Sequence, residues 1–80
     1  MLYVVATPIG NLGDVTERAR AILDDVDVVL CEDTRVTAKL MASLKIRPSL
    51  RAFHEHTDAL ARKTIVDELV IGVSMAIVTD

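Results

Sequence analysis

The sequence predicts an α/β fold, a parallel sheet with flanking helices in the order β-α-β-α-β-α-β. Short apolar runs alternate with stretches of helical periodicity, which is the pattern of strands joined by crossover helices. Of the 80 residues 51% are hydrophobic, yet the chain has only one Tyr, one Phe and no Trp. Such an aliphatic composition is typical of parallel strands that are covered by helices on both faces.

The first strand and the first helix are predicted from the amino-terminal residues. Residues 2–6 form a continuous β-prone run, which predicts a strand buried on both faces. A loop with Gly, Pro and Asn follows at residues 7–13. Asp14 and Glu17 have the spacing of a capping box, so a helix is expected from about residue 15 to residue 24. Its apolar stripe is expected to consist of Val15, Ala19, Ile22 and Leu23.

A second strand and a second helix follow. Residues 26–31 are mostly apolar and give way abruptly to the charged run Glu32-Asp33-Thr34-Arg35. Asp33 or Thr34 is expected to cap the next helix, which ends before Pro48. One side of this helix is expected to carry Val36, Leu40, Met41 and Leu44.

Two more strands are predicted on either side of a third helix. A short strand is expected at residues 50–53, and Thr57 is the expected N-cap of a helix from residue 58 to about residue 71. Gly72 suits the C-terminal turn of that helix, and residues 73–78 predict the fourth strand. One apolar face of the third helix carries Leu60, Ala61, Ile65 and Leu69. Because the order ends on a strand with no helix to cover it, we expect an incomplete domain at the amino-terminal end of a longer protein.

Net charge and cysteine content limit the partners and the cellular compartment that the sequence predicts. Twelve acidic against nine basic residues give a net charge of −3, so there is no bulk electrostatic attraction to nucleic acid or to membranes. Cys31 is the single cysteine and lies in an apolar run, which favours an intracellular, cytoplasmic protein. No run of about 18 apolar residues exists, so no transmembrane helix is expected.

Four polar clusters are predicted to meet at one edge of the sheet. They follow the four strands at residues 7–13, 32–35, 54–57 and 79–80. The carboxyl ends of parallel strands share an edge, and α/β folds bind small molecules there. Other basic residues are scattered and are expected to form a solvated surface: Lys39, Lys45, Arg47, Arg51, Arg62 and Lys63.

The first of these clusters contains Thr7, Pro8, Ile9, Gly10 and Asn11. The helix that follows points backbone N–H groups back toward this loop, which suits a nucleotide-like ligand. The alternative interpretation is an ordinary turn between a strand and a helix. The loop is not G-x-G-x-x-G and lacks the Lys-Ser/Thr of a P-loop, so neither dinucleotide nor triphosphate binding is supported.

The second cluster offers Glu32, Asp33 and Arg35 as candidates for orienting a substrate or accepting a proton. The alternative is helix capping together with a weak surface ion pair. Adjacent residues at a strand end point to opposite sides, so Glu32 and Asp33 cannot readily act as a paired general acid and base. Arg35 is the best single candidate for contacting a phosphate.

The third and fourth clusters carry weaker signals. His54 and His56 could ligate a metal, but a zinc site needs more ligands and Cys31 is the only thiol, so no metal is expected. Loop histidines that make hydrogen bonds are the alternative. Asp80 has the position of a ribose-binding carboxylate, and its alternative role is that of an ordinary residue at the start of a loop.

Two segments closely resemble one subgroup of the tetrapyrrole methylase superfamily. The run YVVATPIGNLGDVTERA at residues 3–19 holds a T-P-I-G-N-L-x-D signature, and DVVLCEDTRVT at residues 27–37 holds an E-D-T-R signature. Residues 53–56 are similar to a further segment of that subgroup, although Thr57 stands where Asn is expected. Residues 79–80 are similar to the start of an S-D-A-G-T-P segment, with Thr in place of Ser.

The resemblance implies the amino-terminal portion of a two-domain fold that binds S-adenosylmethionine in the cleft between its domains. It implies methyl transfer to a ribose 2′-hydroxyl of small-subunit ribosomal RNA, with that RNA or the small ribosomal subunit as partner. Residues 7–11 and Asp80 would then line the cofactor cleft, and Glu32, Asp33 and Arg35 would position the substrate or supply the general base. A homodimer without a membrane partner is expected, and the 80 residues alone are expected to be catalytically inert.

Two alternative functions stay open. Other members of the superfamily methylate carbon atoms of tetrapyrroles, but their first loop reads G-P-G, where this chain has T-P-I-G at residues 7–10. The second alternative is a non-catalytic nucleotide-binding or receiver-like module. A receiver needs acidic residues after its first strand, where this chain has Thr7 and Pro8.

Overall fold

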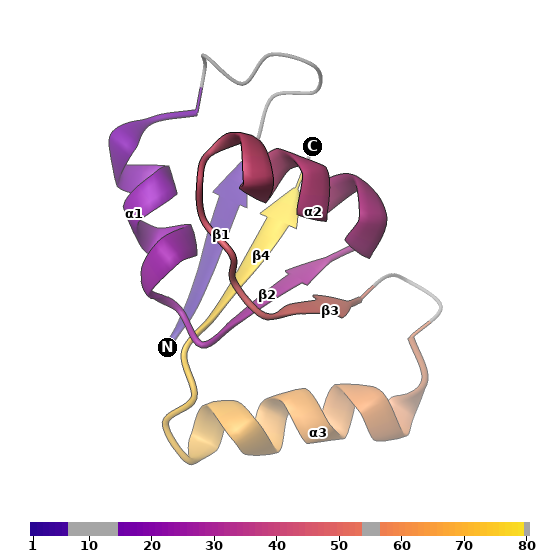
Figure 1. The fold of residues 1–80 in the computed structure, drawn as a ribbon. Coiled ribbons are helices and arrows are strands. Elements are labelled where there is room, and N and C mark those ends of the chain that lie inside the picture. Colours follow the sequence, from indigo (N-terminus) through magenta and orange to yellow (C-terminus); the bar gives the residue numbers. More distant parts are fainter. Residues whose placement is uncertain (7–14, 54–56, 80) are drawn as a thin grey trace.

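The computed structural model describes residues 1–6, 15–53 and 57–79 of the chain (Figure 1). Strands and helices alternate along it, which confirms the predicted α/β class and the predicted order. The elements are β1 (Leu2–Ala6), α1 (Glu17–Asp25), β2 (Val28–Cys31), α2 (Thr34–Ser43), β3 (Leu50–Ala52), α3 (Ala59–Val70) and β4 (Met75–Thr79).

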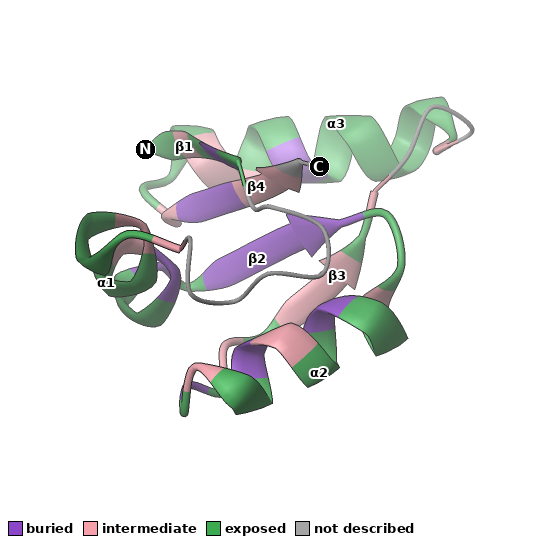
Figure 2. Cartoon of the chain, turned by 90° about the horizontal axis from the view of Figure 1, so that it is seen from above, coloured by how far each residue is buried: buried purple, intermediate pink, exposed green. Residues whose placement is uncertain are grey.

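The described strands form a four-stranded sheet in the order β1-β4-β2-β3, and every pair in it is parallel. The last strand therefore lies between the first and the second. Helices α1 and α2 cover one face of the sheet and α3 covers the other (Figures 1 and 2). This layering is the one that right-handed crossovers produce when they pass on both sides of a parallel sheet.

Each face of the sheet has its own hydrophobic core. On the α1 and α2 side the buried residues are Val5, Leu23, Val26, Val29, Met41, Ile46 and Ala76. On the α3 side they are Val28, Leu30, Ile65 and Met75. Met75 and Ala76 are both fully buried because successive residues of β4, an interior strand, face opposite cores. Strand β2 is also interior, and Figure 2 shows that it is buried throughout.

The prediction that residues 2–6 are buried on both faces is wrong. Only Val5 of β1 is buried, whereas Val4 is 72% exposed and Leu2 is also exposed. Strand β1 lies at an edge of the described sheet, and Val4 is on the face opposite to Val5, where it joins neither hydrophobic core. A continuous apolar run indicates that a strand can be buried on both faces, but it does not determine the neighbours of that strand.

Two helices begin one or two residues later than predicted. Helix α1 begins at Glu17 with Thr16 as its N-cap, and the Thr16 side chain accepts a hydrogen bond from the Ala19 N–H. Asp14, the predicted start, lies outside the described residues. Helix α3 is capped by Asp58 and not by Thr57, since the Asp58 carboxylate accepts a 2.7 Å hydrogen bond from the Ala61 N–H.

The burial predicted for the apolar stripes of the helices is confirmed at their central residues and wrong at some of their end residues. Leu23, Met41 and Ile65 are buried as predicted, whereas Val36 is 65% exposed and Leu60 is 75% exposed. Both exposed residues lie in the first turn of their helices, and in α2 the next residue, Thr37, is buried in place of Val36. Ala61 is exposed as well.

The other boundaries follow the prediction closely. Helix α3 ends at Val70, and Gly72 adopts the left-handed conformation with a φ of 102°, which confirms its predicted place in the C-terminal turn. Strands β2 and β4 each begin two residues later than predicted, at Val28 and Met75. The residues just before them, Asp27 and Ser74, hydrogen-bond to each other through both side-chain and backbone atoms.

Candidate functional site

The carboxyl ends of the four described strands lie at one edge of the sheet, because all strand pairs are parallel. Ala6 at the end of β1 is the register partner of Thr79 in β4, and Cys31 at the end of β2 is the partner of Ala52 in β3. Predicted cluster residues that lie outside the described part are Thr7, Pro8, Ile9, Gly10, Asn11, His54, Glu55, His56 and Asp80. The turn between β2 and α2 is therefore the part of the candidate site whose geometry can be followed.

This turn brings Glu32, Asp33 and Arg35 to the surface directly after a buried strand. Asp33 is the N-cap of α2, which confirms one of the two predicted caps, Asp33 or Thr34. Its Oδ1 atom accepts hydrogen bonds from the backbone N–H groups of Arg35 at 2.9 Å and of Val36 at 3.5 Å. A side chain that caps a helix in this way typically stabilises it by about 0.5–2 kcal/mol relative to alanine.

Arg35 extends into solvent from the first turn of α2. Its side chain is 92% exposed, and its Nε atom lies 4.0 Å from Oδ1 of Asp33. An ion pair this exposed contributes little to stability, because water screens both charges. The guanidinium keeps donors that can bind an anionic group, and Arg binds phosphate through paired N–H donors.

Glu32 is exposed and makes no hydrogen bond or ion pair with any residue that the structure describes. The two neighbouring carboxylates therefore differ, since Asp33 is bound to the backbone of α2 and Glu32 is not. That they do not act together as acid and base stays a prediction.

Cys31 and Thr37 form the buried floor beneath the turn. Both are buried, and the Cys31 thiol donates a long hydrogen bond to the Arg51 carbonyl oxygen at 3.9 Å. Burial raises the pKa of the Cys31 thiol; the Thr37 side chain opposes this shift and the nearby Asp33 carboxylate adds to it. The thiol thus stays protonated near neutral pH, which suits packing and not nucleophilic chemistry.

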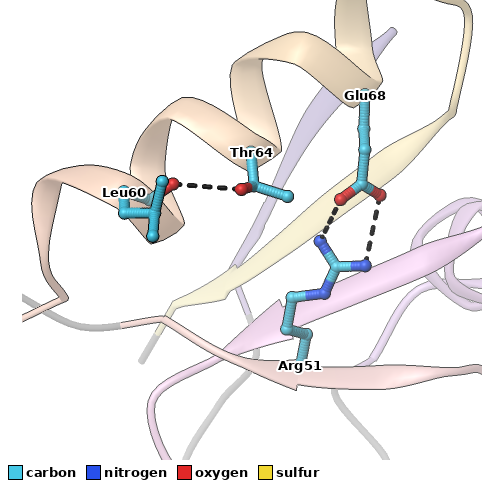
Figure 3. A network of polar contacts seen from close by, with 4 residues as sticks. All are labelled: Arg51, Leu60, Thr64 and Glu68. Carbon is cyan, nitrogen blue, oxygen red and sulfur yellow. Dashed lines mark hydrogen bonds and ion pairs between the residues drawn. The ribbon is translucent and has the colours of Figure 1, made fainter.

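Arg51 was predicted to belong to the solvated surface, and the structure corrects this. Its guanidinium donates two hydrogen bonds to the Glu68 carboxylate of α3, at 2.8 and 3.1 Å (Figure 3). The two side chains are only 39% and 25% exposed. Sequence reasoning missed this pair because it depends on which face of β3 meets α3, although an Arg inside a strand is a signal for such a partner.

A hollow of about 460 Å³ lies between β1 and α1, away from the strand ends that form the candidate site. Tyr3, two arginines and two aspartates line it, so its charges balance and favour no ion of either sign. One of the arginines, Arg20, already donates from its Nε atom to the Leu44 carbonyl oxygen at 3.0 Å. The hollow therefore lacks the convergent groups of a site for chemistry.

Two further searches concern only the described residues. Among residues 1–6, 15–53 and 57–79, no group of three or more His, Cys, Asp or Glu side chains could hold a metal ion. None of the helices found there has the length and apolar character needed to cross a membrane.

Comparison with known proteins gives one consistent result. The family profile described as Tetrapyrrole (Corrin/Porphyrin) Methylases matches residues 1–79. A protein of Vibrio cholerae named Ribosomal RNA small subunit methyltransferase I is 46% identical over 80 residues, which are 100% of this chain and 28% of that protein. A protein of the same name from Erythrobacter litoralis is 57% identical over 65 residues, which are 81% of this chain and 23% of that protein.

A third relative of that name, from Halalkalibacterium halodurans, is 46% identical over 79 residues. The match covers 99% of this chain and 27% of the relative. The chain thus spans less than a third of the length of the curated relatives it matches.

Proposed function

The chain belongs to the family of tetrapyrrole (corrin/porphyrin) methylases, and we propose that it is part of an S-adenosylmethionine-dependent methyltransferase that modifies small-subunit ribosomal RNA. The observation that carries the proposal is the match of the whole chain, at 46% identity, to a relative named Ribosomal RNA small subunit methyltransferase I. The reaction we propose is methylation of a ribose 2′-hydroxyl.

We further propose that the chain forms the amino-terminal α/β portion of that enzyme and that a second domain completes the cofactor cleft. The length of the relatives supports this arrangement, because the chain accounts for 28% of the Vibrio cholerae protein. The parallel sheet is suited to such a role, since ligands of open α/β folds bind at the carboxyl ends of the strands.

The cofactor residues we propose are Thr7, Pro8, Ile9, Gly10, Asn11 and Asp80. The support from the described residues is the pairing of β1 with β4. Ala6 and Thr79 are register partners, so the segments that follow them in the chain start from neighbouring strands. The bound cofactor supplies a methyl group carried by a positively charged sulfur. A backbone loop rich in Gly and Pro and a carboxylate suit the contacts of an aminoacyl nucleoside.

The substrate residues we propose are Glu32 and Arg35, with Asp33 holding the turn between them. A ribose hydroxyl is a weak nucleophile until it loses its proton, so a positioned base accelerates its attack. Glu32 is the exposed carboxylate of this turn without a described partner, and it accepts the 2′-hydroxyl proton in our scheme. Arg35, which is 92% exposed, contacts a phosphate of the RNA.

Methyl transfer by the full-length protein tests the proposed function. Tritium-labelled S-adenosylmethionine is offered with undermethylated small ribosomal subunits and, in parallel, with a tetrapyrrole precursor. Label that remains in an alkali-resistant dinucleotide of the RNA supports ribose methylation, because a 2′-O-methyl group blocks alkaline cleavage. Label in the tetrapyrrole alone contradicts the proposed substrate, and label in neither supports a binding module.

We also propose that the protein acts in the cytoplasm, where small ribosomal subunits are available, and that it forms a homodimer. The dimer proposal is supported by Leu2 and Val4 of β1, which are exposed apolar residues on an edge strand. Exposed apolar side chains on an edge strand favour contact with another polypeptide.

A further inference from the structure

We infer that Asp33 is a positioning residue that acts on the RNA substrate through Arg35 and does not itself transfer a proton. This inference rests on the proposed function, because it assigns separate roles to three residues of the same site. It leaves the proton to Glu32 and the phosphate contact to Arg35.

A single carboxylate oxygen of Asp33 lies close to both the backbone and the side chain of Arg35. Oδ1 of Asp33 accepts from the Arg35 N–H at 2.9 Å and from the Val36 N–H at 3.5 Å. The same atom lies 4.0 Å from Nε of Arg35. One carboxylate oxygen therefore holds the backbone of Arg35 by a hydrogen bond and lies within ion-pair distance of its side chain, so it biases the direction in which the guanidinium leaves α2.

Proton transfer by Asp33 would remove these contacts. A protonated carboxyl group is a poorer acceptor for two backbone N–H groups, and it no longer attracts the guanidinium. If Asp33 took the substrate proton, the turn would loosen at the moment when the substrate has to be held in line. Glu32 can be protonated without this consequence, because its side chain makes no hydrogen bond or ion pair with a residue that the structure describes.

Helix α3 provides a matched control. It is also capped by an aspartate, since Asp58 accepts a 2.7 Å hydrogen bond from the Ala61 N–H. Two residues after the cap, where α2 has Arg35, α3 has Leu60. Replacing Asp58 by alanine thus removes a similar cap that has no arginine two residues after it.

The test uses the full-length protein, and its readouts are kcat, KM for undermethylated small subunits, the salt dependence of subunit affinity without cofactor, and the melting temperature. The variants are Asp33→Ala, Asp33→Asn, Arg35→Ala, the double variant Asp33→Ala/Arg35→Ala, and Asp58→Ala. Asparagine caps helices about as well as aspartate but carries no charge and cannot accept a proton as a base.

We expect Asp33→Ala and Arg35→Ala to raise KM roughly tenfold, the loss that follows from one charge-assisted hydrogen bond, with kcat changed less than about twofold. Arg35→Ala lowers the slope of log affinity against log salt by about one, as for the loss of one phosphate contact. Asp33→Asn restores only part of the affinity, because its amide oxygen still accepts from the backbone N–H groups but carries no charge to attract the guanidinium. The double variant is no worse than Arg35→Ala. Asp58→Ala leaves KM unchanged.

Several results would overturn the inference. A large loss of kcat in both Asp33→Ala and Asp33→Asn would mean that the charged carboxylate takes part in the chemistry. Additive effects in the double variant, or an equal rise of KM in Asp58→Ala, would mean that Asp33 does not act through Arg35. Failure of the wild-type protein to methylate or bind the subunits overturns the proposed function itself, and this outcome is distinct from all the others.

Discussion

Asp27 and Ser74 join the start of β2 to the start of β4, although they lie 47 positions apart in the chain. The Asp27 carboxylate accepts hydrogen bonds from the Ser74 N–H at 2.8 Å and from the Ser74 hydroxyl at 3.1 Å. The Asp27 N–H in turn faces the Ser74 Oγ and carbonyl oxygens, each at 3.0 Å. This contact closes the end of the sheet opposite the candidate site.

We predict that this contact makes stability depend on pH in the acid range. The backbone N–H and the hydroxyl of Ser74 lower the pKa of Asp27 below its ordinary value of 3.8. A group whose pKa is lowered in the folded state stabilises the fold above its ordinary pKa, and this stability is lost as the pH falls through the lowered pKa. Asp27→Asn should therefore unfold at lower urea concentration than wild type at neutral pH, and the difference should shrink below about pH 4.

The control for that prediction is Ser74→Ala, which removes the hydroxyl donor and keeps the backbone N–H. It should reduce the pH dependence only in part, because the backbone hydrogen bond is the larger cause of the shift. A constant difference between Asp27→Asn and wild type at every pH would contradict the proposed role of the charge.

The ion pair between Arg51 and Glu68 gives a second prediction. It is bidentate and half-buried, so it should contribute more than an exposed pair of the same helix. We expect Glu68→Gln to lower the free energy of unfolding by about 1 kcal/mol. The control is Lys63→Ala, which breaks the exposed pair between Lys63 and Asp67 and should cost less than about 0.5 kcal/mol. Equal losses in urea unfolding would show that the paired geometry adds nothing.

The order of elements was predictable from the sequence because the apolar runs of β2 and β4 match what interior parallel strands require. The same pattern in β1 was misleading, since Val4 stands in a β-prone run but lies on an edge strand, where it is 72% exposed. Helix starts were predicted to within a residue or two because cap-competent residues stand side by side. Thr57 and Asp58 can both cap α3, and the structure has Asp58 in the N-cap position with extended backbone angles.

The candidate site was predictable to a different degree. Asp33 as a cap followed from the change from apolar to charged residues after Cys31, and the structure confirms it. The sequence could not predict that the Asp33 carboxylate accepts backbone hydrogen bonds while Glu32 has no described partner. The direction of a side chain is not given by the sequence. The partner of Arg51 likewise depends on how α3 is rotated over the sheet.

Self-association through β1 gives the third prediction. Val4→Lys places a charge on the exposed face of an edge strand, and charged residues there oppose pairing with another strand. We expect the variant to have a lower average mass than wild type in light scattering at the same concentration. Val36→Lys is the control, because Val36 is similarly exposed but lies on α2, on the other side of the sheet. An equal effect of both substitutions would mean that β1 is not the contact surface.

The role of Glu32 gives the last prediction. Glu32→Gln keeps the size and polarity of the side chain but removes its ability to accept a proton. If Glu32 is the base for the ribose hydroxyl, kcat should fall about 10²- to 10⁴-fold while KM for the small subunit changes little. Asp24→Asn, at the far end of α1, serves as a control for the loss of one surface carboxylate and should keep the wild-type rate. A Glu32→Gln variant that kept wild-type kcat would show that Glu32 is not the base. The main source of the rate would then be the alignment of methyl donor and acceptor in the site.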